Sequence, residues 1–125
     1  MKRDMDLIRN LLIGIEKDTD LDGKHELHLE RPEELGISGH SMQEVAYNLG
    51  LLIQAGFVDG GVAYLGDALI AIRSLTWEGH EFLDNIRDPG IWVKTKERIS
   101  GLSGVGLTVV AAIAQAELKK HFGLS

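Results

Sequence analysis

Three aspartates at alternate positions form the most suggestive chemical motif in the sequence. Asp18, Asp20 and Asp22, followed by Gly23, match the first half of an EF-hand calcium loop, which takes oxygen ligands from alternate positions. The second half departs from that pattern, because the twelfth position, where a bidentate glutamate is needed, is Leu29. We therefore interpret the segment as a turn in which Asp side chains bond to nearby backbone N–H groups, and we expect no bound metal.

Histidines supply the other groups that could bind a metal or transfer a proton. His25 and His28 are spaced like metal ligands, but a strand would place them on opposite faces, and no third ligand is evident. His80, beside Glu81 in a predicted helix, and His40 would need a deep polar pocket to act as acids or bases. Neither a Ser-His-Asp order nor a pair of carboxylates stands out. We expect a protein that is not an enzyme and uses no cofactor.

Cysteine and glycine patterns exclude further chemistry. The sequence has no cysteine, which excludes a disulfide scaffold, a thiol nucleophile and a thiolate zinc site. The glycine-rich stretch over residues 101–106 follows a predicted helix rather than a strand and lacks the lysine of a phosphate-binding loop. We interpret this stretch as a loop between helices.

The size and composition of the chain are typical of one globular domain. It has 125 residues, of which 44% are hydrophobic and 26% charged. The N-terminal residues do not form a secretory signal. The longest apolar run without charge, residues 102–116, falls short of the roughly 20 residues that span a bilayer. We expect a cytoplasmic protein that does not associate with membranes.

Apolar residues at helical spacing, with capping residues before them, predict five helices. These helices span residues 4–17, 41–55, 76–87, 89–101 and 105–122. Alternating and β-branched stretches predict short strands, with a tight turn at Gly66 and Asp67. The strands span residues 25–30, 57–58, 62–65 and 69–75.

The order of these elements is that of a winged helix, in which a recognition helix precedes a two-stranded wing. We predict an α+β fold, a winged helix-turn-helix-like domain over residues 1–88 with three short antiparallel strands. Residues 89–125 form an additional C-terminal helical extension, either packed on that domain in a single compact unit or forming a dimer interface. The recognition helix runs from Ser41 to Ala55, and the wing covers residues 62–75.

Two segments carry a resemblance to known families. Residues 45–58, VAYNLGLLIQAGFV, resemble the recognition helix and its exit in winged-helix regulators, and residues 75–83, LTWEGHEFL, resemble their segment after the wing. The chain as a whole is more similar to domain of unknown function family 2513, an uncharacterised bacterial and prophage family. Its members open like residues 1–9 and carry a segment like residues 86–94. The resemblance covers nearly the whole chain and implies a winged-helix fold without an established activity.

The predicted recognition helix has the wrong charge for DNA. No Lys or Arg occurs from Pro32 to Ile72, although binding to a duplex depends on cations placed against its phosphates. Gln and Asn can recognise adenine, but they do not hold a helix in the groove without phosphate contacts. The candidate partner or recognition surface, opposite the core stripe of the helix, consists of Gln43, Glu44, Tyr47, Leu51 and Gln54, with Asn48 on its flank.

Two functions remain open. We predict a non-catalytic module that acts through protein contacts or self-association in a prophage or regulatory setting, because Tyr47 and Leu51 suit a protein partner. Cover by the C-terminal helices would explain this face equally well. The last helix, apolar nearly all round in its first three turns, favours a homodimer. The alternative is a DNA-binding transcriptional regulator, whose candidate phosphate contacts are Lys2, Arg3, Lys94, Lys96 and Arg98.

Overall fold

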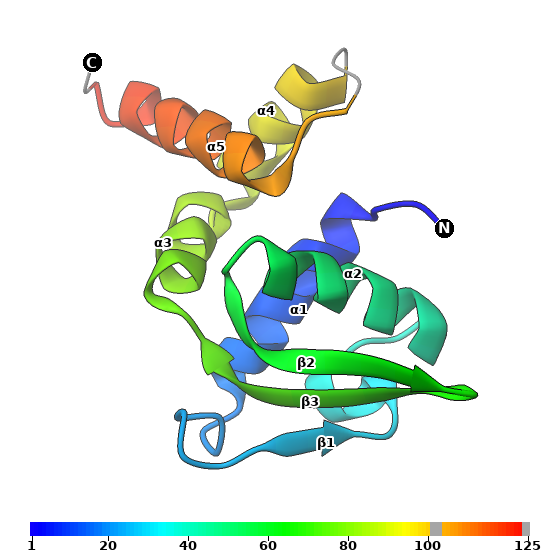
Figure 1. Cartoon of the computed structure of the whole chain (residues 1–125). Helices are drawn as coiled ribbons and strands as arrows, with labels where there is room; N and C mark the ends of the chain where they lie inside the picture. The colour runs from blue at the N-terminus through cyan, green and yellow to red at the C-terminus, as the bar shows by residue number, and fades with distance from the viewer. Residues whose placement is uncertain (101–103, 124–125) are drawn as a thin grey trace. The chain divides into compact units, whose positions relative to one another are not determined.

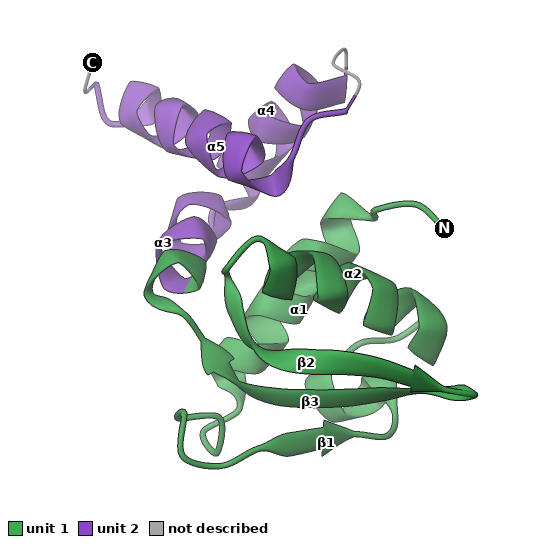
Figure 2. Ribbon diagram, viewed as in Figure 1, with its two compact units in different colours: residues 1–79 green, residues 80–125 purple. Residues whose placement is uncertain are grey.

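The computed structural model describes residues 1–100 and 104–123. Within them the chain is α+β, with five α-helices, one short 3-10 helix and a three-stranded antiparallel sheet (Figure 1). The α+β prediction with three antiparallel strands is therefore confirmed. The chain divides into two compact units, residues 1–79 and 80–125 (Figure 2). The division falls inside a helix, whereas the sequence placed a boundary after residue 88.

The first helix of unit 1, α1, spans Met5–Lys17, as the periodicity predicts. Its N-cap is Asp4, whose Oδ1 accepts a backbone hydrogen bond from the first turn at 3.0 Å. Gly14 allows the 3-10 helix η1, Pro32–Leu35, to approach closely, because a Cβ at this position would collide with the carbonyl oxygen of Leu35. The buried side chains of α1 are Leu7, Ile8, Leu11, Leu12 and Ile15.

The second helix, α2, spans Met42–Gln54 and begins with the predicted capping box. The Ser41 Oγ accepts from the Glu44 N–H at 3.1 Å, and the Glu44 Oε1 accepts from the Ser41 N–H at 3.0 Å. Gly56 follows the helix with a φ of +83°, the left-handed conformation that ends many helices. Both ends of this helix therefore follow from local signals in the sequence.

The buried face of α2 differs from the predicted core stripe. Met42 and Ile53, which the stripe includes, are only partly buried, whereas Ala46 and Asn48 are buried. The difference arises because α1, β2 (Val58–Leu65) and a third element, the central strand of the sheet, all pack against this helix. The helix's own periodicity does not encode where those neighbours lie.

The sheet has its longest strand in the centre. β3, Asp67–Leu75, pairs antiparallel with β1, Leu27–Leu29, on one side and with β2 on the other, so the order is β1-β3-β2. β1 is shorter than the predicted strand over residues 25–30. Ile70 and Ile72 of β3 are buried and belong to the core. β2 is an edge strand of this sheet.

β2 is one continuous strand where the sequence predicts two pieces, residues 57–58 and 62–65. An irregularity in the register between Asp59 and Gly60 joins them. A Cβ at Gly60 would collide with the carbonyl oxygen of Ala71, so glycine keeps β2 close to β3 at this bulge. The cross-strand contact, rather than any local signal, accounts for the longer strand.

Three helices follow the sheet. They are α3, Trp77–Ile86, which crosses the division between the units, α4, Pro89–Ser100, and α5, Leu107–His121. Thr76 caps α3, since its Oγ1 accepts from the Gly79 N–H at 3.0 Å. Asp88 caps α4, since its Oδ1 accepts from the Gly90 N–H at 2.8 Å. Both caps are as predicted, with Pro89 at the first helical position.

The last helix is less buried than its composition predicts. Leu107, Val110 and Ala114 are buried, but Val109 is 49% exposed. The predicted end of the preceding helix at Gly101 lies outside the described residues, as does the start of the glycine-rich loop. Within the part of the chain that the structure describes, no helix combines the length and the apolar character needed to cross a membrane.

Candidate functional site

The helix α2 and the β2–β3 hairpin lie next to each other in unit 1 (Figure 1). A groove of about 470 Å³ runs between α2 and β2, which we call the α2–β2 groove. Its lining contains no charged side chain. From α2 come Ala46, Tyr47, Gly50, Leu51, Ile53 and Gln54, and from β2 come Gly61, Val62 and Tyr64.

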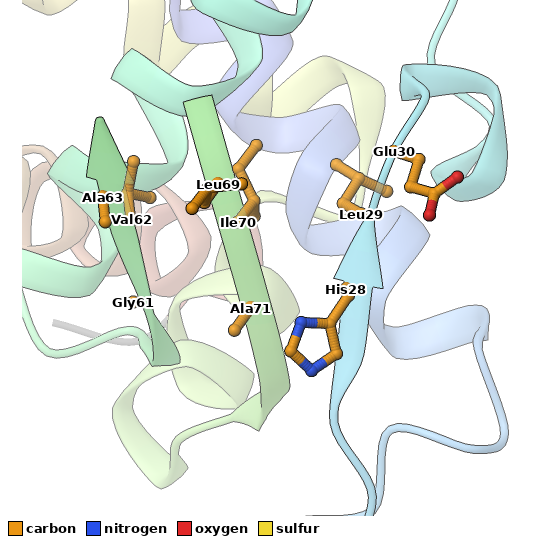
Figure 3. Close-up of a pocket in the computed structure, with 9 residues that line it drawn as sticks. All are labelled: His28, Leu29, Glu30, Gly61, Val62, Ala63, Leu69, Ile70 and Ala71. Atoms are coloured by element: carbon orange, nitrogen blue, oxygen red, sulfur yellow. The ribbon is translucent and has the colours of Figure 1, made fainter. Parts of the chain in front are cut away.

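A second hollow, also of about 470 Å³, lies on the sheet itself (Figure 3). The register places His28 beside Ala71 and Ala71 beside Gly61, so small residues on the two long strands leave space next to the histidine. Leu69 also lines this hollow. Gly61 and Val62 line both the sheet hollow and the α2–β2 groove, so this part of β2 lies between the two.

The tip of the hairpin exposes large apolar side chains. Tyr64 is 60% exposed, Leu65 is 80% exposed and Leu69 is 52% exposed. Gly66, with a φ of +86°, forms the tight turn between the strands. Sequence reasoning did not single out these side chains, although Tyr64 and Leu65 directly precede the turn predicted at Gly66. Tyr64 lines the α2–β2 groove, whereas the register places Leu65 and Leu69 on the other face of the sheet. We call the exposed residues of α2 and this hairpin tip together the α2–hairpin surface.

The residues predicted on the exposed face of α2 fall into three groups. Gln43 and Gln54 are exposed, and Tyr47 and Leu51 are partly buried and line the α2–β2 groove. Glu44 is partly buried and belongs to the capping box, so much of its bonding capacity serves the helix itself. The groove therefore brings together Tyr47, Leu51 and Gln54 with residues of β2.

Asn48 is not on the flank of that face, and its predicted placement was wrong. Its side chain is 1% exposed. Its Oδ1 accepts from the Asp4 N–H at 2.8 Å, and its Nδ2 donates to the Glu44 carbonyl oxygen at 2.9 Å. Asn48 thus joins the start of α1 to α2 inside the protein.

Two acids of the cation-free stretch, Glu44 and Glu34, have a lowered pKa, so they stay charged at a lower pH than a free glutamate does. The Ser41 N–H, and then the His40 ring, lower the pKa of Glu44, and the His40 Nδ1 lies 3.4 Å from the Glu44 Oε2. The N–H groups of Arg31 and Glu30 lower the pKa of Glu34 in the same way. The stretch from residue 32 to 72 therefore stays acidic at neutral pH.

The candidate phosphate contacts are divided between the two units. They are Lys2 and Arg3 before α1, and Lys94, Lys96 and Arg98 on α4. In unit 2, the Lys96 Nζ lies 5.7 Å from the centre of the Trp92 ring, and Arg98 donates to the Glu117 Oε1 at 3.0 Å. Two of the three α4 bases thus already interact within their own unit.

The aspartate-rich turn uses its side chains to bond its own backbone. The Asp18 Oδ1 accepts from the Asp20 N–H at 3.0 Å, and the Asp22 Oδ1 accepts from the Lys24 N–H at 2.9 Å. The latter bond lowers the pKa of Asp22. Among the described residues, the side chains of His, Asp and Glu nowhere gather in threes as a metal ion requires.

The sequence comparisons assign the chain to a family. A family model described as "Hypothetical protein (DUF2513)" matches residues 2–106. The chain belongs to this family. A protein of Haemophilus influenzae (strain ATCC 51907 / DSM 11121 / KW20 / Rd), described as "Uncharacterized protein", is 32% identical to this DUF2513 member over 117 residues, which cover 92% of this chain and 93% of the relative. No solved structure matches it.

The predicted family membership is therefore confirmed. The DUF2513 match includes α2, the hairpin and α4, and it ends at residue 106, directly before α5. The α2–hairpin surface thus lies within the part of the chain that defines the family, while the helix predicted to form a dimer interface lies outside it.

Proposed function

We propose that this DUF2513 member is a non-catalytic winged-helix module that binds another protein through its α2–hairpin surface. The order α1-β1-η1-α2-β2-β3 and the sheet order β1-β3-β2 support the winged-helix assignment. In that arrangement α2 is the recognition helix, the β2–β3 hairpin is the wing, and η1 takes the place of the helix between β1 and α2.

One observation favours a protein rather than DNA as the partner. Residues 32–72, which include all of α2 and most of the hairpin, contain no Lys or Arg, yet the hairpin exposes Tyr64 beside the α2–β2 groove and Leu65 and Leu69 on the other face of the sheet. Contacts between cations and phosphates supply most of the affinity for a DNA duplex. Aromatic and aliphatic side chains that gather on a surface are typical of a protein interface instead.

The lining of the α2–β2 groove supports binding rather than catalysis. Its polar side chains are two tyrosines and Gln54. Neither a carboxylate, an imidazole nor an amine lines it, so the groove offers no group that titrates near neutral pH. Apolar contact is what this surface provides.

The second candidate function is that of a DNA-binding transcriptional regulator. The winged-helix order of elements favours it, and Lys94 on α4 is exposed. In this case the duplex would be held by the bases outside α2, namely Lys2, Arg3, Lys94, Lys96 and Arg98.

A gel-shift assay on mixed genomic fragments separates the two functions. We expect no retardation near 50 mM salt with up to about 100 μM protein, where non-specific DNA-binding proteins bind readily. Tight binding that weakens steeply with salt, and that Lys94→Glu abolishes, would contradict the protein-binding proposal and establish the alternative.

Photo-cross-linking tests the proposal directly. With p-benzoylphenylalanine in place of Leu65, at the tip of the hairpin, we expect a protein adduct in cells that express the full chain. The same residue in place of Asn10, exposed on α1, is the matched control. An adduct of equal yield at both positions, or none at residue 65, would contradict a partner at the α2–hairpin surface.

A further inference from the structure

Two glycines of unit 1 have no structural reason to be glycine. Gly50 lies in the middle of α2 and Gly61 in β2, and neither has a positive φ. A Cβ added at either position meets no atom within 4 Å. At Gly14, Gly60 and Gly79, by contrast, a Cβ would collide with a carbonyl oxygen of the chain. Glycine weakens both helices and strands, so its presence at the first two positions calls for another cause.

Both glycines line the α2–β2 groove, one on each wall. Glycine within a regular element, where neither a turn nor an internal contact requires it, is typical of a site that another backbone approaches closely. Ala46, another small residue, also lines the groove and is buried. The groove is therefore shaped for a main chain rather than for a large side chain.

The wall formed by β2 offers a free strand edge. β2 pairs with β3 on one side, and no strand of the described residues pairs with its other side. Edge strands commonly carry Lys or Pro that prevent further pairing, and β2 has neither. Its charged residue, Asp59, lies at the bulge near its start, which leaves residues 61–65 as a regular apolar edge.

We propose that the α2–β2 groove binds an extended segment of a partner protein, which adds to the edge of β2 as a fourth strand. This inference rests on the proposed function and specifies its partner. Because alternate side chains of a strand point to opposite faces, one set would contact Tyr47 and Leu51 in the groove. The other set would lie toward the sheet hollow, which shares Gly61 and Val62 with the groove.

Charge specifies the partner further. Asp59 is paired with Arg73 of β3 at 3.3 Å, whereas no Lys or Arg within residues 32–72 balances Glu44 and Asp67, which lie in the elements that form the groove and the hairpin. The segment that fits carries apolar residues in its centre and Lys or Arg at its ends. A second copy of the chain fits less well, because residues 1–79 contain 14 Asp and Glu against 7 Lys and Arg.

A phage-displayed library of random 12-residue peptides, selected on the full chain, tests this proposal. We expect enriched peptides with alternating apolar residues between Lys or Arg. A synthetic peptide of the enriched sequence is expected to bind at least tenfold more weakly to Gly50→Leu, which places new atoms in the open space of the groove. Ala112→Leu, on an exposed position of α5, is the matched control and should bind as the parent does.

Strand addition has its own signature in hydrogen exchange. The bound peptide should protect backbone amides within residues 61–65, and N-methylation of alternate peptide residues should abolish binding. Circular dichroism of each variant confirms that it is folded, so that a loss of affinity reports on the groove.

Four results would overturn the proposal. Three of them are the absence of any enriched peptide, enrichment of acidic peptides, and equal affinity of the parent and Gly50→Leu. Light scattering that shows a dimer which Gly50→Leu dissociates would assign the groove to a second copy and would likewise overturn it. If one of these results occurs while the cross-link from residue 65 still forms, the groove proposal fails and the proposed function stands.

Discussion

The α2–β2 groove and the junction between β3 and α3 both contain a glycine inside a regular element, but for different reasons. At the junction, Gly79 lies against the backbone of Phe57, and no other residue leaves room for that contact. In the groove, Gly50 and Gly61 face open space. The difference shows that the fold explains glycine where two segments of this chain meet, and that it does not explain the two glycines of the groove.

The distribution of Lys and Arg differs between the two units, and this difference also distinguishes the α2–hairpin surface. An even distribution of the 13 Lys and Arg over 125 residues would place about four within residues 32–72, which contain none. In α4, by contrast, three bases occur within five residues. The chain therefore has cations available, and their absence is specific to residues 32–72, which include α2 and most of the hairpin.

Substitution of Gly79 should have the largest effect on the free energy of unfolding. It tests whether the junction between β3 and α3 requires glycine. Gly79→Ala places a Cβ against the carbonyl oxygen of Phe57, so one of the two backbones must move. We expect a loss of about 3 kcal/mol in the free energy of unfolding, measured in urea. An unchanged free energy of unfolding would show that the junction does not require glycine and would remove the contrast with the groove.

Substitution of Asn48 separates the buried side of α2 from its exposed side. Asn48→Leu leaves the Asp4 N–H without its acceptor in a partly buried position, and we expect a loss of about 2 kcal/mol. Gln43→Leu, on the exposed side, is the matched control and should change the free energy of unfolding by less than about 0.5 kcal/mol. Equal losses for the two variants would contradict the assignment of Asn48 to the core.

Substitution of Gly50 should raise the free energy of unfolding, whereas substitution of Gly79 should lower it. Gly50→Ala adds a methyl group in open space within a helix, so we expect a gain of about 0.5–1 kcal/mol in the free energy of unfolding. The same urea titration measures it. A loss of stability would reveal an internal reason for this glycine and would weaken the argument that a partner's backbone occupies the groove.

The pH dependence of stability shows how much of the acidity of residues 32–72 serves the fold. The pKa of Glu44 is lowered in the folded state, so its contribution is present above its ordinary value of 4.5 and is lost as the pH falls through the lower folded value. Glu44→Gln keeps an oxygen that can cap α2 but does not titrate. We expect its melting temperature to fall less than that of the parent between about pH 5 and pH 3. Identical pH profiles would contradict this role.

The sequence predicts those features that depend on near neighbours along the chain. Ser41, Thr76 and Asp88 were predicted as caps, and each bonds an N–H two or three residues ahead. Asn48 was misplaced because its partner, the Asp4 N–H, is 44 residues away. Helical periodicity alone identifies an apolar stripe, and it does not show that a polar side chain beside the stripe has a buried partner.

The candidate site could be predicted only in part, for the same reason. Tyr47 and Leu51 follow from the helix pattern, since they lie opposite its core stripe. The second wall of the groove, with Gly61 and Tyr64, requires the strand register and the bulge at Asp59, which depend on β3. The absence of cations was visible in the sequence, whereas the shape of the groove was not.

Hydrogen exchange of the full chain, measured with a selected peptide and separately with duplex DNA, tests the central claim most directly. The account predicts that the peptide protects the amides of α2 and of residues 61–65, and that DNA leaves their exchange unchanged. Protection of the α2 amides by duplex DNA, without any effect of the peptide, would contradict it.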